Sequence, residues 1–486
     1  MQAHVADKEL VRGQLYVDGR WRDSSDGGLF PVRNPANGDW LGSVAAAGES
    51  ETHEAIEAAQ RAWPAWRALT PDERGRLLRK WGALMRAASA DLSVIMTLEQ
   101  GKPLAEARGE IEYAASFLDW FAEEGRRAYG ETIPSHLTGR RLMTTRQPIG
   151  VVAAITPWNF PSAMITRKAG AALAAGCPVI VRPADETPFS ALALAALAER
   201  AGLPAGVFSV VTGDARTIAQ ALTTSEIVRA VSFTGSTEVG RTLLRQCADS
   251  VKRVSLELGG HAPFIVFDDV DIAAAARLAV SAKFQTSGQD CLAANRILIQ
   301  RRRYAEFVDH FVELTRALRV GNGLDPGVDI GPLISQRAVA RCERQIHDAI
   351  AKGASLRFGG GRHSAGPLFV TPTVLADTTP DMLIHREETF GPVAAILPFD
   401  NEQEAIEIAN DTIYGLAAYI CTHDLDRALR VSDALDYGMV AINTDRFTGP
   451  PIPFGGIKQS GLGREGSRHG LDEYLELKYI CIAGAP

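Results

Sequence analysis

Cysteine is scarce in this chain of 486 residues, and its spacing is irregular. The six cysteines, scattered between Cys177 and Cys481, form neither the close pairs of a zinc site nor the pattern of a disulfide framework. All except Cys291 are expected to be the small buried hydrophobes that free cysteines usually are. The sequence therefore predicts neither a metal site nor a disulfide-stapled fold.

Long hydrophobic runs and clusters of positive charge are also missing. The longest apolar stretch, Ala169 to Val181, is broken by Gly170, Gly176 and Pro178, and it falls short of the roughly 20 residues that a membrane span requires. The opening "MQAHVADKEL" is charged, unlike a secretory signal or a transit peptide. The net charge is −7 and the basic residues are scattered, so no footprint for nucleic acid is present. We expect a cytoplasmic protein without nucleic-acid or membrane partners.

Alternating strand and helix patterns fill most of the chain. Residues Ser50 to Glu124 show helical periodicity. Two strand–helix alternations follow. In the first, strands are expected at 150–156, 177–182, 207–211 and 228–235. In the second, strands are expected at 262–267, 295–300 and 391–399, and helices are expected up to Ala282 and over 307–318 and 402–410. Such alternation predicts an α/β protein with two doubly wound, parallel-sheet lobes.

The lobes are expected to meet at Gly259 and Gly260. The segments 125–147 and 473–482 alternate like exposed strands, which are a hazard unless another subunit pairs with them. We therefore expect a small β element that supports a homodimer or homotetramer. The predicted division is a first lobe of 1–124 and 148–259, a second lobe of 260–459, and a bridging element of 125–147 and 460–486.

Cys291 is the best candidate for a reactive group. It lies in "KFQTSGQDCLAANR", where Gly288, Gln289 and Asp290 indicate a turn that presents the thiol to a substrate. Glu257, in "LELGG", supplies a carboxylate that could activate water, and a nucleophile together with a base indicates covalent catalysis. The same pair could hydrolyse esters without a cofactor, so an esterase or thioesterase is an alternative. A binding protein without catalysis would be expected to lack such residues.

Six segments together resemble the aldehyde dehydrogenase superfamily. They are "TPWNFP", "FTGSTEVG", "LELGG", "GQDC", "EETFGP" and "PFGGIKQSGLGREG", in the order of that superfamily, and the resemblance covers essentially the whole chain. Within it, "NFPSAMITRKAGAALAAGCPVIV" and "KQSGLGREGSRHGLDEYLELKY" are most similar to succinate-semialdehyde dehydrogenases. The resemblance implies the aldehyde dehydrogenase fold, with an NAD(P)-binding first lobe, a catalytic second lobe and an oligomerisation element.

The resemblance assigns five catalytic positions. Cys291 is implied to attack the aldehyde and form a thiohemiacetal and then a thioester, and Glu257 is implied to activate the water that hydrolyses the thioester. Leu256 and Leu258 predict an apolar pocket that raises the pKa of Glu257. Asn159 matches the oxyanion-hole side chain, although an asparagine at this place could merely cap a turn.

Two further catalytic positions have strong alternatives. Lys168 resembles a lysine near the cofactor ribose and a proton-relay path, but a solvated helix lysine is the commoner fate of such a residue. Glu465 resembles a second carboxylate that relays protons outward, and a surface ion pair with Arg464 or Arg468 is the competing interpretation.

The cofactor site is implied mainly by the resemblance. "FTGSTEVG" predicts a strand before Gly235 and a helix after it, and a helix N-terminus suits a pyrophosphate, although the segment is not the G-x-G-x-x-G fingerprint. Glu388 is implied to bind the nicotinamide ribose. The full set of expected cofactor residues is Thr156, Trp158, Lys168, Arg182, Asp185, Gly235, Ser236, Gly240, Leu258, Glu388 and Phe390.

Two of these positions give opposite indications about the cofactor. Asp185 stands where a glutamate is common in enzymes that prefer NAD, and a carboxylate there accepts from the ribose 2′-hydroxyl and repels a 2′-phosphate. Arg182 stands where the family usually has lysine, and a guanidinium could accept that phosphate. We expect NAD, with NADP possible.

The substrate side departs from the succinate-semialdehyde pattern. Arg167, in "MITRK", matches an arginine that grips the substrate carboxylate, but Gln285 and Thr286 replace the arginine and asparagine of "KFRN". Arg446, in a loop with Thr448, could supply the missing charge, or it could simply pair with Asp445. We expect an aldehyde substrate with a distal carboxylate, with glutarate semialdehyde, 2-oxoglutarate semialdehyde or a neutral aldehyde as alternatives. Ala293 replaces the second cysteine of relatives with "CVC", so their disulfide switch is not expected.

Overall fold

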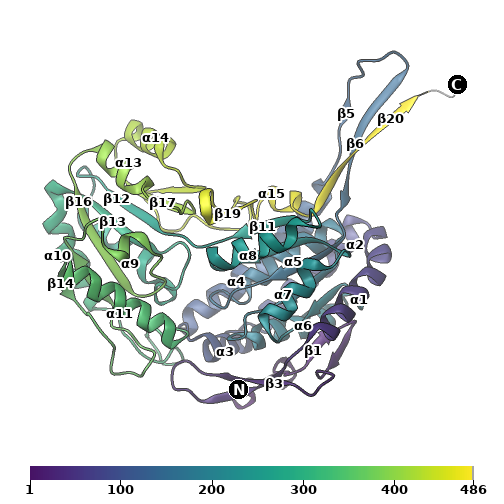
Figure 1. Cartoon of the computed structure of the whole chain (residues 1–486), viewed down its shortest axis with the longest axis horizontal. Helices are drawn as coiled ribbons and strands as arrows, with labels where there is room; N and C mark the ends of the chain where they lie inside the picture. Colours follow the sequence, from purple (N-terminus) through teal and green to yellow (C-terminus); the bar gives the residue numbers. More distant parts are fainter. Residues whose placement is uncertain (484–486) are drawn as a thin grey trace.

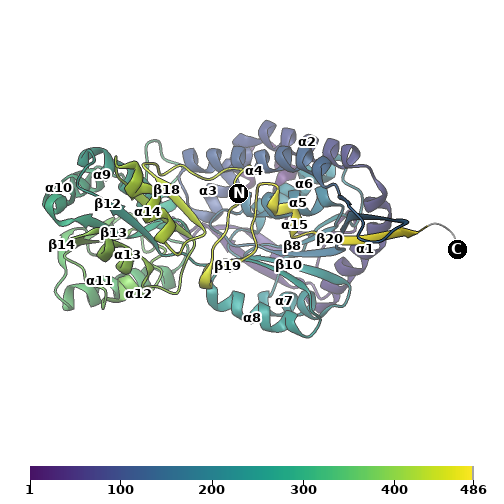
Figure 2. The same cartoon turned by 90° about the horizontal axis from the view of Figure 1, so that it is seen from above.

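Two α/β lobes and a projecting β arm make up the molecule in this computed structural model, which describes residues 1–483 (Figure 1). The lobes lie side by side, and the C-terminal strand runs to the tip of the arm, as a second view also shows (Figure 2). The predicted α/β fold with two sheet-containing lobes is confirmed. No helix within residues 1–483 is both long and apolar enough to span a membrane.

The sheet of the first lobe has eight strands. Its central strands are parallel and the edge strands run antiparallel to their neighbours. The order is β19 (Gly461–Leu462), β11 (Arg253–Glu257), β10 (Val228–Thr234), β7 (Val151–Ile155), β8 (Val179–Arg182), β9 (Phe208–Val210), β1 (Leu15–Val17) and β2 (Arg20–Arg22). The helices after the central strands are α5 (Ala163–Ala175), α6 (Pro188–Ala201), α7 (Ala215–Thr224) and α8 (Thr237–Ala248).

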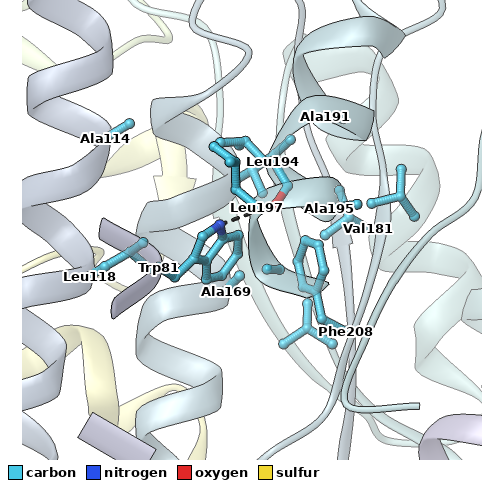
Figure 3. Close-up of a cluster of buried hydrophobic side chains, with 14 of the residues drawn as sticks. Trp81, Ala114, Leu118, Ala169, Val181, Ala191, Leu194, Ala195, Leu197 and Phe208 are labelled. Atoms are coloured by element: carbon cyan, nitrogen blue, oxygen red, sulfur yellow. Dashed lines mark hydrogen bonds between the residues drawn. The ribbon is translucent and has the colours of Figure 1, made fainter. Parts of the chain in front are cut away.

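The helical region predicted for Ser50 to Glu124 is present as four helices, α1 (Glu49–Ala68), α2 (Pro71–Ala87), α3 (Ser89–Gln100) and α4 (Leu104–Glu124). Thr70 starts α2 with a capping box to Glu73, which satisfies free N–H groups at the helix start. Trp81 of α2 is fully buried, donates from its indole nitrogen to the carbonyl of Leu194 at 3.1 Å and packs edge-on against Phe208 (Figure 3). These helices are thereby fixed to the first lobe.

The sheet of the second lobe has seven strands, parallel except at one edge. Its order is β14 (Ser355–Phe358), β15 (Thr373–Ala376), β16 (Val393–Phe399), β13 (Ala294–Gln300), β12 (Ala262–Val266), β17 (Ala417–Cys421) and β18 (Met439–Ile442). The helices are α9 (Ile272–Phe284), α10 (Tyr304–Arg316), α11 (Gln336–Ala351), α12 (Leu383–Arg386), α13 (Glu402–Asn410) and α14 (Leu425–Ala434). Its central strands are buried on both faces, which explains their continuous apolar sequence.

The arm is a three-stranded antiparallel sheet in the order β20 (Leu475–Ala483), β6 (Arg140–Pro148) and β5 (Thr132–Ile133). The two expected exposed strands therefore pair with each other, and β20 leaves a free edge. Sequence patterns missed the short strands β1, β2 and β19 at the margins of the first sheet, together with the hairpin of β3 (Leu29–Arg33) and β4 (Trp40–Ala45). They also missed β14, β15, β17 and β18, four of the seven strands of the second sheet. The remaining short elements are α15 (His469–Asp472) and 3₁₀ turns at Gln2–His4, Lys8–Leu10, Gly125–Arg127, Gln285–Gly288, Arg301–Arg303 and Lys458–Ser460.

Candidate active site

A cavity of about 1020 Å³ lies where the two lobes meet, and it gathers the strongest sequence candidates. Cys291, Glu257 and Asn159 all line it. Glu257 ends β11 in the first sheet, whereas Cys291 precedes β13 in the second. The chain crosses from one sheet to the other between Glu257 and Ala262. The thiol and the carboxylate therefore come from different lobes and line the same cavity.

The loop that carries Cys291 is tightly packed. Gly260 lies against it so closely that a Cβ on this glycine would stand 2.1 Å from the carbonyl oxygen of Cys291, so no other residue fits there. Burial raises the pKa of the Cys291 thiol well above its usual value, and the Asp290 and Glu388 carboxylates raise it further. These surroundings favour the neutral thiol over the thiolate.

Glu257 has the environment of a general base. Its side chain is buried, and neither carboxylate oxygen has a hydrogen-bond partner within residues 1–483. Burial raises the pKa of Glu257 well above its usual value, and the nearby Glu465 carboxylate raises it further. This direction confirms the sequence prediction. A carboxylate with free oxygens and a raised pKa can accept a proton from a water molecule near neutral pH.

Asn159 lies after β7 and reaches the cysteine loop. Its amide nitrogen donates to the backbone carbonyl of Gln289 at 3.1 Å. The side chain is buried and lines the cavity. The amide is thus oriented toward the chain segment that ends in Cys291, as an oxyanion donor beside the nucleophile requires.

Lys168 and Glu465 form a buried ion pair. The Lys168 ammonium donates to Oε1 of Glu465, while the other oxygen of Glu465 lies 3.7 Å from the Arg167 guanidinium. The alternative of a solvated Lys168 is wrong, because its side chain is buried. The alternative of a surface pair between Glu465 and Arg464 or Arg468 is also wrong, since Glu465 is buried against other partners. Neither Lys168 nor Glu465 lines the cavity itself.

Arg167 points its guanidinium into an aromatic enclosure at the cavity wall. The guanidinium carbon lies 4.3 Å from the ring centroid of Phe454 and 4.8 Å from that of Phe117, and Nη2 donates to the hydroxyl of Tyr113. Its Nε and Nη1 atoms are buried without a hydrogen-bond partner in the described chain. The Glu465 carboxylate balances the charge of Arg167 at 3.7 Å, but buried donors without a hydrogen bond are costly, so these two nitrogens favour a further acceptor.

The other predicted substrate residues, Gln285, Arg446 and Thr448, also line the cavity. Arg446 is exposed and forms no ion pair with Asp445 or any other carboxylate among residues 1–483. Asp445 lines the same cavity. The mouth therefore carries both signs of charge, with the Arg446 guanidinium free to meet an anion.

The expected cofactor residues divide into two groups. Trp158, Gly235, Ser236, Leu258, Glu388 and Phe390 line the cavity, whereas Thr156, Lys168, Arg182, Asp185 and Gly240 do not. Ser236 caps α8 by accepting from the Val239 amide at 3.4 Å. The rings of Trp158 and Phe390 pack edge-on, with 5.5 Å between their centroids. This end of the cavity thus joins a helix N-terminus to two aromatic rings.

Glu388 belongs to the group that lines the cavity, whereas Arg182 belongs to the group that does not. Glu388 accepts from the Gly260 amide at 2.9 Å, and burial raises its pKa to about 7. Arg182 is buried, donates to Asp185 and donates to the carbonyl of Gly213 at 3.0 Å. The two charges that indicated opposite cofactors therefore bind each other.

Two cavity residues on α4, Tyr113 and Glu106, stand in no motif that would identify them. Phe454, in the loop before β19, stands within "PFGGIKQSGLGREG" but was not singled out. Helical periodicity marks α4 as amphipathic but does not tell which of its polar side chains face a cavity formed with a different lobe. The resemblance likewise assigned them no role.

Comparisons with known proteins agree along the whole chain. The model of the "Aldehyde dehydrogenase family" matches residues 21–480. The chain is 56% identical to the "Succinate-semialdehyde dehydrogenase [NADP(+)]" of Escherichia coli over 98% of its length and 99% of the relative's. It is 55% identical to a glutarate-semialdehyde dehydrogenase of Pseudomonas aeruginosa, over 99% of both chains. The crystal structure of a succinate-semialdehyde dehydrogenase from Burkholderia pseudomallei superposes with a TM-score of 0.98 at 53% identity, covering 99% of this chain and 100% of that one.

Proposed function

The chain belongs to the aldehyde dehydrogenase family, and on that premise we propose that it oxidises a carboxylated semialdehyde to the acid with NAD(P)⁺ as oxidant. Succinic semialdehyde or a close relative is the proposed substrate. The observation that carries this choice is the Arg167 side chain, which lines the cavity that holds Cys291 and has two guanidinium nitrogens without a hydrogen-bond partner among residues 1–483. A carboxylate suits these donors better than a neutral group does.

The proposed reaction begins at Cys291. Glu257 takes the proton of the thiol as the sulfur adds to the aldehyde carbon and passes it on toward Glu465, and the carbonyl oxygen becomes an alkoxide held by the Asn159 amide and the Cys291 backbone N–H. Removing one such donor typically costs about 3–4 kcal/mol of transition-state stabilisation. Loss of a hydride from the thiohemiacetal carbon leaves a thioester on Cys291. Glu257 then takes a proton from water, the hydroxide breaks the C–S bond, and the acid and thiol are released.

The first-lobe end of the cavity fits a dinucleotide. Thr234 lines it with a buried hydroxyl that has no partner among residues 1–483, and Ser236 begins α8 beside it. A helix N-terminus favours phosphate, and Glu388 would hold the nicotinamide ribose. NAD(P)⁺ supplies the hydride acceptor when bound. We keep NAD as the proposed preference and place Arg182 and Asp185 near the adenosine ribose.

Lys168 and Glu465 are proposed to carry the proton away from Glu257. Glu465 raises the pKa of Glu257 and binds Lys168, so the three groups form a buried chain of titratable side chains. We further propose that residues 1–124 and 148–259 bind the cofactor and that 260–459 supply the nucleophile.

Assembly and compartment are also proposals. The free edge of β20 exposes Leu477, Tyr479 and Ile482, and such an edge favours pairing with a second copy of the chain as a homodimer or homotetramer. Light scattering coupled to size-exclusion chromatography would measure the assembly, and a monomer at micromolar concentration would contradict the proposed oligomer.

All six cysteines are free, which supports a reducing compartment such as the cytoplasm.

The test of the main proposal is the initial rate of NADH and NADPH formation with succinic, glutaric and 2-oxoglutaric semialdehydes beside hexanal and benzaldehyde. Preference for an acidic semialdehyde is the expected result. The relative that acts on glutarate semialdehyde makes that substrate the second candidate. Equal or faster turnover of neutral aldehydes would contradict carboxylate recognition, and a Cys291→Ala variant with full NAD reduction would contradict the chemistry. Ester hydrolysis without NAD and without aldehyde oxidation would favour the esterase alternative.

A further inference from the structure

The loop before Cys291 adopts a backbone conformation that its residues do not favour. Thr286 and Ser287 both have positive φ angles, 51° and 58°. Two consecutive non-glycine residues in the left-handed region are strained, and a β-branched threonine there is a marked outlier. Such a conformation persists only where the surroundings hold it, so the contacts of this loop determine where the thiol lies.

Within the second lobe, the loop is held through two side chains. The Ser287 hydroxyl donates to the carbonyl of Gly331 at 3.2 Å and accepts from the Gly331 amide at 2.9 Å. The Gln289 amide donates to the carbonyl of Pro332 at 3.3 Å and accepts from the Ile334 amide at 3.0 Å. These four bonds fix the outer side of the loop.

The first lobe holds the other side, and Glu106 makes that contact. Glu106 lies on α4, and its two carboxylate oxygens accept from the Thr286 backbone amide at 3.2 and 3.0 Å. The strained Thr286 thus has its N–H paired to a different lobe. Asn159, also from the first lobe, donates to the carbonyl of Gln289, so both ends of the turn are tied across the cavity.

We propose that Glu106 is a positioning residue that sets the place of the Cys291 thiol by holding the Thr286 amide across the lobe junction. This positioning role rests on the proposed function only because it takes Cys291 as the nucleophile. Without Glu106 the Thr286 N–H loses its partner, and the turn can relax out of the left-handed region. The thiol then moves relative to Asn159 and to the bound aldehyde, and a shift of about 1 Å can slow a reaction by about 100-fold.

The contact needs an acceptor oxygen rather than a full negative charge. Burial raises the pKa of Glu106 to about 7, while the Lys102 ammonium lowers it and the Asp290 carboxylate raises it. A protonated carboxyl group still accepts through its carbonyl oxygen. Glutamine keeps one such oxygen at the same distance along the side chain, whereas alanine keeps none.

The test compares Glu106→Ala, Glu106→Gln and, as a control on the same helix, Glu112→Ala. Glu112 is exposed and binds only Arg86. Two readouts do not depend on aldehyde oxidation: amide hydrogen exchange of the peptide that covers 285–291, and the rate at which iodoacetamide alkylates Cys291, followed by mass spectrometry because Cys481 is exposed as well. The third readout is kcat and KM for the aldehyde and for NAD.

For Glu106→Ala we expect faster exchange in 285–291, an alkylation rate changed by about tenfold, and kcat for the aldehyde reduced by about 10- to 100-fold with KM for NAD unchanged. Glu106→Gln is expected to recover most of each change, and Glu112→Ala to match the wild type. Wild-type exchange and alkylation in Glu106→Ala would overturn the proposal even if kcat falls, since Glu106 would then act on the substrate itself. If Glu106→Ala does not fold, the Glu106→Gln variant decides: unprotected hydrogen exchange throughout 285–291 in that variant would also overturn the proposal. If no aldehyde is oxidised by the wild type, the exchange and alkylation results still decide.

Discussion

The Lys168 ammonium and the Glu465 carboxylate form an ion pair from which solvent is excluded. Glu465 also lies close enough to Glu257 to raise its pKa. A second buried carboxylate beside Glu257 would normally be unfavourable for both groups. Lys168 and Arg167 offset that repulsion, because both cations lie against Glu465. The ionisation of Glu257 therefore depends on Glu465 and Lys168, which do not line the cavity, and on Arg167, which does.

A Glu465→Gln variant tests this control. Removing the negative charge of Glu465 stabilises the ionised form of Glu257, so the pKa of Glu257 falls. Because Glu257 must be ionised to activate water in the proposed mechanism, the acidic limb of the pH–kcat profile is expected to move to lower pH. The exposed carboxylate Glu476, changed to Gln, is the control and should leave the limb in place. An acidic limb that stays where the wild type has it would contradict the coupling.

An Asp290→Asn variant tests the electrostatics of the thiol. The Asp290 carboxylate raises the pKa of Cys291, and asparagine removes the charge while it retains an oxygen to accept from the Leu292 amide, which Asp290 binds at 2.9 Å. We expect the pH at which alkylation of Cys291 reaches half its maximal rate to fall.

The matched control for the thiol is Asp445→Asn, another cavity carboxylate that is not among the groups raising the pKa of Cys291. Its alkylation midpoint should equal that of the wild type. An unchanged midpoint in Asp290→Asn, or an equal fall in both variants, would mean that the charge of Asp290 does not govern the thiol.

Much of the fold was predictable from the sequence because its signals are local. The helices of 49–124 follow from periodicity, and buried strands such as β7 and β12 follow from short apolar runs bounded by glycine or proline. The strands β1 and β19 were missed, because each is only two or three residues long and joins the first sheet from a distant part of the chain. Pairing of that kind depends on tertiary contacts rather than on local pattern.

The candidate site divides in the same way. Cys291, Glu257 and Asn159 stand in recognisable segments, and all three line one cavity. Glu106 and Tyr113 could not be found, because their contacts are with residues of other segments or with the other lobe. The partner of Glu465 was misjudged for a related reason. The nearby arginines in the sequence were considered, whereas Lys168, distant in sequence, binds it.

Arg446→Ala tests whether Arg446 supplies the positive charge that is missing because Gln285 stands in place of an arginine. Arg446 lines the cavity, and none of the described carboxylates neutralises it. Loss of a charge-assisted hydrogen bond to the substrate carboxylate is expected to raise KM for acidic semialdehydes by about tenfold or more, while KM for hexanal stays constant. Lysine at the same position should recover part of the loss. An Arg446→Ala enzyme with wild-type KM for acidic semialdehydes would contradict this role.

Asp185→Ala tests the proposed NAD preference. In the structure Asp185 binds Arg182, so its removal frees a guanidinium for a 2′-phosphate and removes a charge that repels one. We expect the ratio of kcat/KM for NADP to that for NAD to rise by about tenfold. Asp214→Ala offers a nearby control, because its carboxylate caps α7 and is not part of the proposed ribose contact. A ratio that does not change in Asp185→Ala would place the adenosine ribose elsewhere.

Thr286→Asn tests whether the cysteine loop stores strain. Threonine at a φ of 51° is unfavourable, whereas asparagine tolerates the left-handed region. The two side chains differ little in volume, and the backbone N–H to Glu106 is retained. We expect Thr286→Asn to raise the free energy of unfolding by about 1 kcal/mol, seen as a higher guanidinium midpoint. Thr242→Asn, at an ordinary helical position of α8, should not stabilise the chain, and an unchanged or lower midpoint for Thr286→Asn would show that the loop is not strained at this residue.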